Sequence, residues 1–188
     1  MQLLFPAGLA EKVVAAYEST GRHYHNLGHI RACLAVADEF DPRDHMVTLA
    51  ICYHDVVYDT QSTDNERLSA EWAVHDLRIA GAGKADCDRM TRLIMATEHR
   101  AALHEDDEKM VADADLSVLG SPIDDYDRYV RAVRQKYGWM DDEDFRAGRA
   151  DFLRRMLARP TIFSTERMRQ RLEKRARNNL MREWQGLA

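Results

Sequence analysis

The dipeptide His54-Asp55 stands in the stretch ICYHDVVYD, between two apolar runs. Apolar neighbours on both sides suggest that both side chains point into the protein. A neutral imidazole and a carboxylate are complementary ligands for a divalent zinc, iron, manganese or cobalt ion. Taken alone, however, such a dipeptide is more often an aspartate that accepts a hydrogen bond at a helix end.

A second carboxylate, Asp115, stands in the stretch MVADADLSVLG. If this segment is helical, aliphatic residues lie three and four positions before and after Asp115, on its own helix face. Burial of a carboxylate among aliphatic side chains is costly unless a cation compensates it. We therefore predict that Asp115 faces inward towards a metal ion or a cationic partner. Asp113 is the alternative if the segment is not helical.

Two histidines, His25 and His29, are four residues apart in RHYHNLGHI. If a helix begins near residue 25, both imidazoles lie on one helix face and can bind one ion or one ligand. Two helical histidines more often make local hydrogen bonds. Arg22 adds positive charge just before them.

Two further polar residues stand next to predicted helix ends. Glu66 follows the polar stretch YDTQSTDN, where Asp64 or Asn65 can cap a helix. The carboxylate of Glu66 could complement the helix dipole, or it could orient and deprotonate a water molecule beside the His-Asp pair. His99 ends another helix, where it could stabilise the helix dipole, bind phosphate or hold a second metal ion.

The elements that position these residues are predicted to be helices throughout. The chain has only four prolines and nine glycines, and apolar residues recur at helical spacing almost everywhere. Asp41 is the candidate cap of the third helix, and the dipeptide His75-Asp76 is expected to face solvent in the fourth. The predicted helices span about 8–19, 25–40, 43–54, 65–80, 84–99, 108–120, 122–137, 142–158 and 165–185.

Length and composition are typical of a soluble protein. The 188 residues suit one domain, and the net charge of −5 gives no argument for nucleic-acid binding. The three cysteines are too few and too scattered for a disulfide framework, so we predict buried thiols and a cytoplasmic location. No apolar run reaches the ~20 residues that span a bilayer.

A histidine, a His-Asp dipeptide and a distant aspartate on an all-α chain together resemble the HD-domain superfamily of metal-dependent phosphohydrolases. The motifs RHYHNLGHI, YHDVVYD, NERLSAE, TEHR, DADLSVLG and ARNNL also occur in the order typical of a small bacterial group of predicted HD phosphohydrolases. This resemblance covers residues 20–182. It implies a single HD-like helical domain over 1–188, with a metal-site core at about 20–120 and a C-terminal helical extension at about 121–188 packed on it.

The resemblance also implies a role for each candidate residue. His25, His54, Asp55 and Asp115 would bind a divalent ion of manganese, cobalt, magnesium, zinc or iron. Asp55 and Glu66 would be catalytic. The predicted substrate is a small phosphorylated metabolite. The protein is predicted to be a monomer or homodimer without nucleic-acid or membrane partners. The candidate substrate-binding residues are Arg22, His29, His99 and Arg177.

Two alternative functions fit the same residues. The chain could be a non-catalytic module that senses a nucleotide, or that binds RNA or an acidic partner through its basic last helix. Acidic residues are interleaved with the basic ones there, which is typical of a solvated helix face. A di-iron oxygenase is a further alternative, because some HD proteins use that chemistry.

Overall fold

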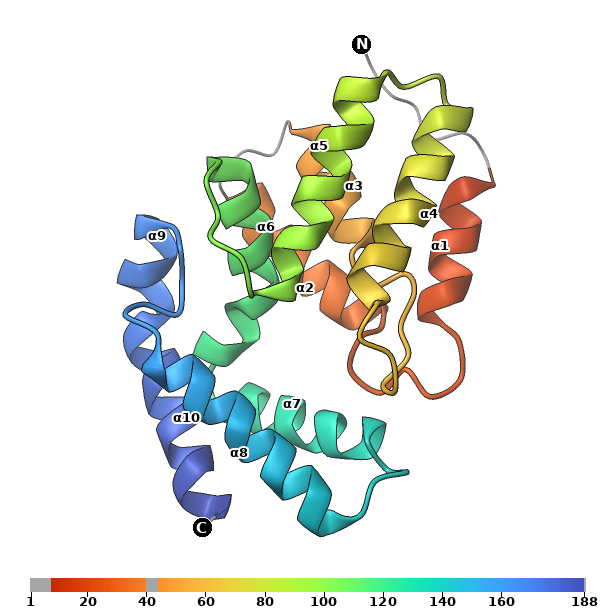
Figure 1. Cartoon of the computed structure of the whole chain (residues 1–188). Coiled ribbons are helices and arrows are strands. Elements are labelled where there is room, and N and C mark those ends of the chain that lie inside the picture. Colours follow the sequence, from red (N-terminus) through yellow and green to blue (C-terminus); the bar gives the residue numbers. More distant parts are fainter. Residues whose placement is uncertain (1–7, 40–43, 188) are drawn as a thin grey trace. The chain divides into compact units, whose positions relative to one another are not determined.

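The computed structural model describes residues 8–39 and 44–187, and every regular element in these ranges is helical (Figure 1). The predicted all-α fold class is confirmed. The chain divides into two compact units, Met1–Asp115 and Leu116–Ala188, close to the predicted boundary at residue 120. The packing of the second unit on the first stays a prediction. Within the described ranges, no helix has the length and apolar character needed to cross a membrane.

The first unit is built around α3, which contacts α2, α4 and α5, while α4 also packs along α5 (Figure 1). Its core is mainly aliphatic where these helices meet; Ala50, Ala73 and Leu93 are completely buried there. Cys33 and Cys87 are buried free thiols, as predicted, whereas Cys52 is only half-buried. The helices of this unit are α1 (Leu9–Tyr17), α2 (Leu27–Asp38), α3 (His45–Tyr53), α4 (Asn65–Ile79), α5 (Lys84–Met95), the short 3-10 helix η1 (Ala96–Glu98) and α6 (Asp106–Leu116).

The start of α2 differs from the predicted start at residue 25. The helix begins at Leu27, because Asn26 is its N-cap and accepts a hydrogen bond from the backbone N–H of Gly28 at 2.8 Å. His25 therefore precedes the helix and does not share a helix face with His29. For α3, the N-cap is Asp44, whereas the predicted cap Asp41 lies outside the described residues.

The polar loop between α3 and α4 is closed by side-chain hydrogen bonds. Asn65 accepts from the backbone N–H of Asp59 at 2.9 Å and donates to its carbonyl at 2.8 Å. Ser69 on α4 accepts from the N–H of Val57 at 3.1 Å. Asp64 occupies the N-cap position of α4 but forms no side-chain cap. These bonds hold the segment that follows His54-Asp55 against the first turns of α4.

The second His-Asp dipeptide was predicted to face solvent, and for its aspartate this prediction is wrong. His75 is exposed, but Asp76 is buried with 5% of its surface accessible. Its Oδ2 accepts hydrogen bonds from the hydroxyl of Tyr53 at 2.8 Å and from the indole N–H of Trp72 at 3.0 Å. The two donors offset the cost of burying the carboxylate.

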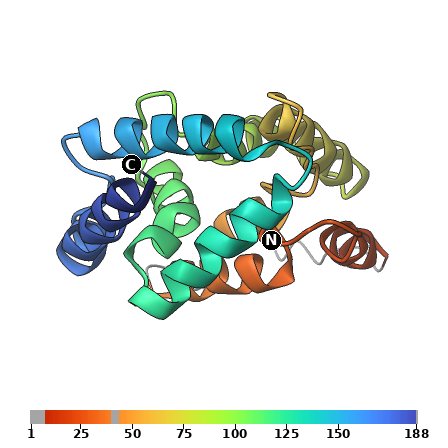
Figure 2. The same cartoon turned by 90° about the horizontal axis from the view of Figure 1, so that it is seen from below.

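In the second unit, α7 and α8 are joined at one end by the turn at 137–141, and α10 packs against α8 (Figure 2). The structure confirms a helix at 142–158, with Asp141 as its N-cap. The predicted helix at 165–185 exists but contains one turn of π-helix. The elements are η2 (Ser117–Gly120), α7 (Ile123–Lys136), α8 (Asp142–Ala158), α9 (Glu166–Met168), the π-helical η3 (Arg169–Glu173) and α10 (Lys174–Leu187).

The π-helical turn brings Leu172 against Gly120. A β-carbon added to Gly120 would lie 2.6 Å from the β-carbon of Leu172 and 3.1 Å from its carbonyl oxygen. We expect Gly120→Ala to lower the free energy of unfolding by about 1–3 kcal/mol, because the packed backbone cannot yield without strain.

Gly148 provides a control with the opposite expected sign. It lies within α8, and apart from its chain neighbours and the adjacent backbone of its own helix, no atom lies within 4 Å of the position of an added β-carbon. Gly148→Ala should stabilise the protein by roughly 0.5–1 kcal/mol, because alanine favours the helix. Urea unfolding of both variants measures the difference; equal midpoints would contradict the close approach at Gly120.

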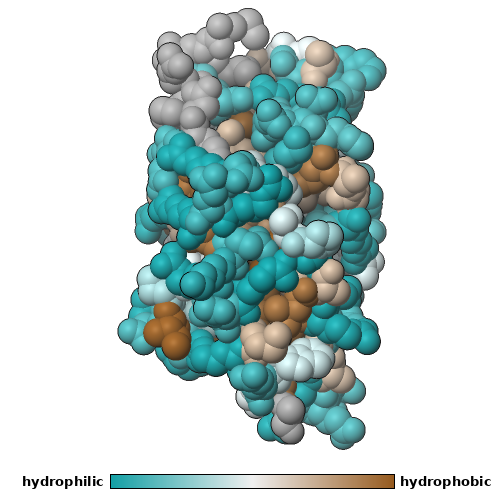
Figure 3. All heavy atoms as spheres, turned by 90° about the vertical axis from the view of Figure 1, so that its left-hand side faces the viewer, coloured by the Kyte–Doolittle hydropathy of each residue, from teal (hydrophilic) through white to brown (hydrophobic). Residues whose placement is uncertain are grey.

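Several basic residues of the last helices pair with neighbouring carboxylates. Arg169 pairs with Glu166 at 2.8 Å, and Arg182 pairs with Asp127 at 2.5 Å. On the face shown in Figure 3, hydrophilic residues predominate and hydrophobic residues form small separate groups. These contacts engage two charges of the predicted basic last helix within the protein.

Candidate metal centre

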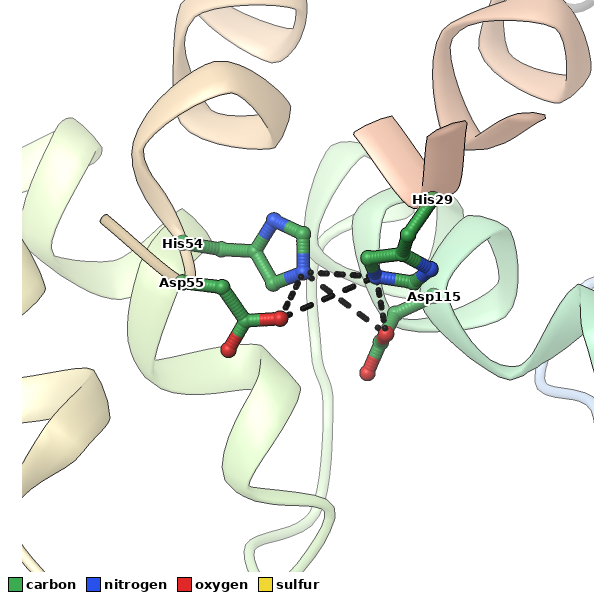
Figure 4. Close-up of side chains that lie close together, drawn as sticks. All are labelled: His29, His54, Asp55 and Asp115. Carbon is green, nitrogen blue, oxygen red and sulfur yellow. Dashed lines mark hydrogen bonds and ion pairs between the residues drawn. The ribbon is translucent and has the colours of Figure 1, made fainter. Parts of the chain in front are cut away.

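Four side chains of the first unit converge on one point: His29, His54, Asp55 and Asp115 (Figure 4). His29 comes from the first turn of α2, His54 and Asp55 follow the end of α3, and Asp115 lies near the end of α6. One potential ligand atom from each residue lies within 4.8 Å of the other three. Residues far apart in the sequence are thus brought together by three helix ends.

The separations between these atoms suit ligands of one metal ion. His54 Nε2 lies 3.1 Å from Asp55 Oδ2 and 3.6 Å from Asp115 Oδ1. His29 Nε2 lies 3.2 Å from His54 Nε2 and 3.2 Å from Asp115 Oδ1. Ligand bonds of ~2.0–2.1 Å in a tetrahedral arrangement place neighbouring ligand atoms about 3.3 Å apart. Only small side-chain movements would be needed to bind an ion.

One carboxylate oxygen in the group lacks a hydrogen bond. Asp55 Oδ2 is the only fully buried side-chain nitrogen or oxygen, among the described residues that are not exposed, without such a partner. Its nearest neighbours are ring nitrogens, His54 Nε2 at 3.1 Å and the Nε2 atoms of His25 and His29 at 3.7 Å, which form ion pairs with it when protonated. A buried carboxylate oxygen without a hydrogen bond is costly, and a metal cation at this point would compensate it.

His54 is oriented for ligation by its other ring nitrogen. Its Nδ1 donates a hydrogen bond to the Ile51 carbonyl at 2.8 Å, so that Nε2 carries the lone pair facing the group when the ring is neutral. The side chain is almost completely buried, with 2% exposure. The last turn of α3 therefore fixes both the direction and the tautomer of this imidazole.

Opposite charges in the group shift its pKa values strongly. Burial acts to lower the pKa of His54, but the carboxylates of Asp55 and Asp115 outweigh it and raise the pKa well above its usual range. Burial acts to raise the pKa of Asp115, but hydrogen bonds from His29, His54 and His99 hold it well below normal. The group therefore keeps ionised carboxylates, and a metal ion must displace a proton from His54 at neutral pH.

The group includes His29, which the sequence interpretation assigned to substrate, and omits His25, which it assigned to the metal. His25 remains close, with Nε2 3.7 Å from Asp55 Oδ2 and its ring stacked 4.4 Å from that of Tyr58. Its position before the N-cap of α2 explains the difference, because only His29 has the helical position that faces α3 and α6. His54, Asp55 and Asp115 come together as the sequence predicted.

His99 contacts the group through Asp115. Its Nε2 lies 2.7 Å from Asp115 Oδ2, while the other oxygen of Asp115 faces His29 and His54. Among the non-glycine residues that the structure describes, only His99 has a left-handed backbone, with φ of 56°. Strained backbone of this kind persists where the surroundings impose it, often at functional sites. The contact orients Asp115.

We expect His99→Asn to weaken cobalt binding roughly 10- to 100-fold, the usual effect of removing a hydrogen-bond partner of a ligand. Asparagine tolerates the left-handed conformation, so the thermal midpoint should change little. A cobalt titration of the variant measures the effect. An unchanged affinity would show that His99 does not position Asp115.

Glu66 lies half-buried in the first turn of α4, next to the loop that follows Asp55. Burial, together with the negative charges of Asp55, Glu98 and Asp115, raises its pKa above the usual value. A carboxyl group with a raised pKa beside a candidate metal centre has the properties of a general base or acid.

The two arginines predicted to bind phosphate make other contacts. Arg22 donates to three backbone carbonyls, including those of Asp55 and Val56. Arg177 pairs with Glu173 at 2.7 Å and donates to the carbonyls at 157, 159 and 160, all within the second unit. These contacts give both side chains structural roles and provide no support for phosphate binding.

The sequence interpretation missed Tyr17, whose hydroxyl accepts a hydrogen bond from the backbone N–H of Asp55 at 3.3 Å. Its apolar helical position in α1 predicts only a core residue.

Comparisons of the chain with models of protein families, with curated proteins and with solved structures found no match.

Proposed function

We propose that the protein is a metal-dependent phosphohydrolase of the HD type, acting on a small phosphorylated metabolite. The observation that carries the proposal is the convergence of His29, His54, Asp55 and Asp115 on one point, with the buried oxygen of Asp55 that lacks a hydrogen bond among them. Two imidazoles and two carboxylates form a donor set suited to zinc, manganese, iron or cobalt. The resemblance of the sequence motifs to HD phosphohydrolases supports the reaction class.

A divalent ion bound here would supply activated water and neutralise charge on a phosphoryl group. Separate residues of the chain would bind the ion and act on the attacking water. His29, His54, Asp55 and Asp115 hold the ion, and the hydrogen bond from His54 to the end of α3 keeps its imidazole directed at it. Glu66, with its raised pKa, orients the attacking water and accepts its proton.

Metal binding is expected to tighten as pH rises. The raised pKa of His54 means that the metal-free protein holds a proton on this ring at neutral pH, whereas ligation requires the neutral ring. At pH values below the raised pKa, each unit by which the pH is lowered should reduce the metal affinity about tenfold for each proton displaced. Cobalt titrations between pH 6 and 8, compared in two buffers of different ionisation enthalpy, measure both the slope and the protons released. A flat response would contradict proton displacement.

A phosphatase screen tests the proposed reaction. Purified protein is stripped of metal, reloaded separately with manganese, cobalt, magnesium or zinc, and incubated with nucleotides, sugar phosphates and other small phosphoesters. We expect at least one metal to support phosphate release, and Glu66→Gln to slow turnover by a factor of about 10²–10⁴ without loss of metal. Metal-loaded protein that hydrolyses nothing in the panel would contradict the proposed reaction.

A further inference from the structure

We propose that Arg22 is a positioning residue that clamps the main chain carrying the ligand Asp55. The inference rests on the proposed function, because it concerns the geometry of the proposed metal centre. It replaces the predicted role of Arg22 in holding phosphate with a role in the shape of the centre.

The guanidinium of Arg22 spans two consecutive peptide groups. Nη1 donates to the Asp55 carbonyl at 2.5 Å, and Nη2 donates to the Val56 carbonyl at 2.7 Å. Nη1 also lies 3.3 Å from the carbonyl of His25. A planar guanidinium can bind two adjacent acceptors with fixed geometry, which an ammonium group cannot do. Both carbonyls follow the end of α3, where a positive charge is also favourable.

Tyr17 completes the clamp from α1. Its ring lies beneath the guanidinium, 5.1 Å from centroid to Cζ of Arg22, and its hydroxyl accepts from the N–H of Asp55. Tyr17 is almost completely buried, with 1% exposure. The N–H and the carbonyl of Asp55 are therefore both held by residues outside α3 and its following loop.

The clamp acts on the main chain of Asp55, whose carboxylate lies in the candidate metal centre. Asp55 Oδ2 is buried in the group without a hydrogen bond, and its neighbours there are the ring nitrogens of His25, His29 and His54 at 3.1–3.7 Å. The hydrogen bonds to its main chain therefore help to set the direction of this carboxylate. The same guanidinium holds the carbonyl of His25, whose ring lies 3.7 Å from Asp55 Oδ2. Supporting contacts of this kind commonly determine the geometry of a functional site.

Arg22→Lys tests the proposal, because lysine keeps the charge but cannot bind both carbonyls. Arg67→Lys is the matched control, because Arg67 is exposed and pairs with the carboxylates of Asp64 and Glu71. Two readouts are needed. The first is amide hydrogen exchange at residues 54–56 in metal-free protein, measured by NMR. The second is the affinity and visible absorption spectrum of bound cobalt(II).

For Arg22→Lys we expect faster exchange at residues 54–56, cobalt affinity lowered by about tenfold or more, and an altered cobalt spectrum. Arg67→Lys should match the wild type in all three. Guanidinium added at millimolar concentration to Arg22→Ala should partly restore the cobalt affinity. If Arg22→Lys leaves exchange and cobalt binding unchanged and only raises KM, Arg22 contacts substrate and the proposal is overturned.

Two outcomes separate this proposal from the proposed function. If the wild-type protein binds no cobalt, the proposed function fails, and amide exchange alone decides the role of Arg22: unchanged exchange in Arg22→Lys overturns it. If Arg22→Lys does not fold, Tyr17→Phe replaces it, since this variant keeps the ring but removes the hydroxyl that accepts from Asp55. Exchange at Asp55 identical to wild type in that variant would also overturn the clamp.

Discussion

Asp55→Asn is expected to weaken binding of a divalent ion by at least ~100-fold and to lower phosphatase turnover on the order of 10³-fold. The substitution keeps the size of the side chain but removes the negative charge from the centre of the group. Asp55 Oδ2 lies among the ring nitrogens of His54 and His29 without a hydrogen bond of its own, and the amide of asparagine brings no negative charge to that position. Two neutral imidazoles and Asp115 alone would bind a cation much more weakly.

Cobalt titration and steady-state kinetics of Asp55→Asn measure this effect, and circular dichroism checks that the variant is folded. Asp106→Asn is the control. Asp106 begins α6, has a side chain 97% exposed and pairs with Lys109, so removing its charge should leave both quantities unchanged. Full metal content and activity in Asp55→Asn would show that the group is not the metal centre.

Arg149→Ala is expected to lower the free energy of unfolding by about 3–5 kcal/mol, the usual cost of leaving one buried charge unpaired. The guanidinium of Arg149 binds both oxygens of Glu183, at 2.7 and 3.0 Å, and donates to the hydroxyl of Tyr129 at 3.1 Å. The side chains of Arg149 and Glu183 are only 7% and 8% exposed. Tyr126 also donates to Glu183 at 2.5 Å.

Arg155→Ala in the same helix is the matched control. Arg155 is exposed and pairs with Asp151, so its replacement should change stability by less than about 1 kcal/mol. Replacing both Arg149 and Glu183 with methionine and leucine should recover much of the loss, because no buried charge is left alone. Urea unfolding measures all three variants. Equal midpoints for Arg149→Ala and Arg155→Ala would contradict a stabilising buried network.

Most helices could be predicted from the sequence because apolar spacing and end signals agree. The helix at 142–158 has an aspartate cap at its start and a proline shortly after its end, and the structure shows the same bounds. The π-helical turn at Arg169–Glu173 has no such local signal. It places Leu172 on Gly120, which is a contact between segments fifty residues apart.

Three members of the centre could be predicted because each is an ionisable residue embedded in apolar sequence. The resemblance to HD proteins implies His25 as the fourth ligand, whereas the group that the structure brings together contains His29. Asn26 is a strong capping residue and could have given the correct start of α2. With that start, His29 lies in the first turn and His25 before it.

The roles of Arg22 and Asp76 could not be predicted, because they depend on partners distant in sequence. The carbonyls that bind Arg22 lie 33 and 34 positions further along the chain. Asp76 is buried because Tyr53 on another helix donates to it. The local sequence shows only that such residues are charged. The packing of the helices decides which charged side chains are buried and which groups form hydrogen bonds with them.

The central claim is that His29, His54, Asp55 and Asp115 together bind a divalent ion. Its most direct test is cobalt or manganese binding by equilibrium dialysis, comparing the wild-type protein with a His29→Ala, Asp115→Asn double variant. We predict one equivalent of ion per chain for the wild type, and none for the double variant at the same free metal concentration. Equal binding by the two proteins, or no binding by the wild type, would contradict the claim.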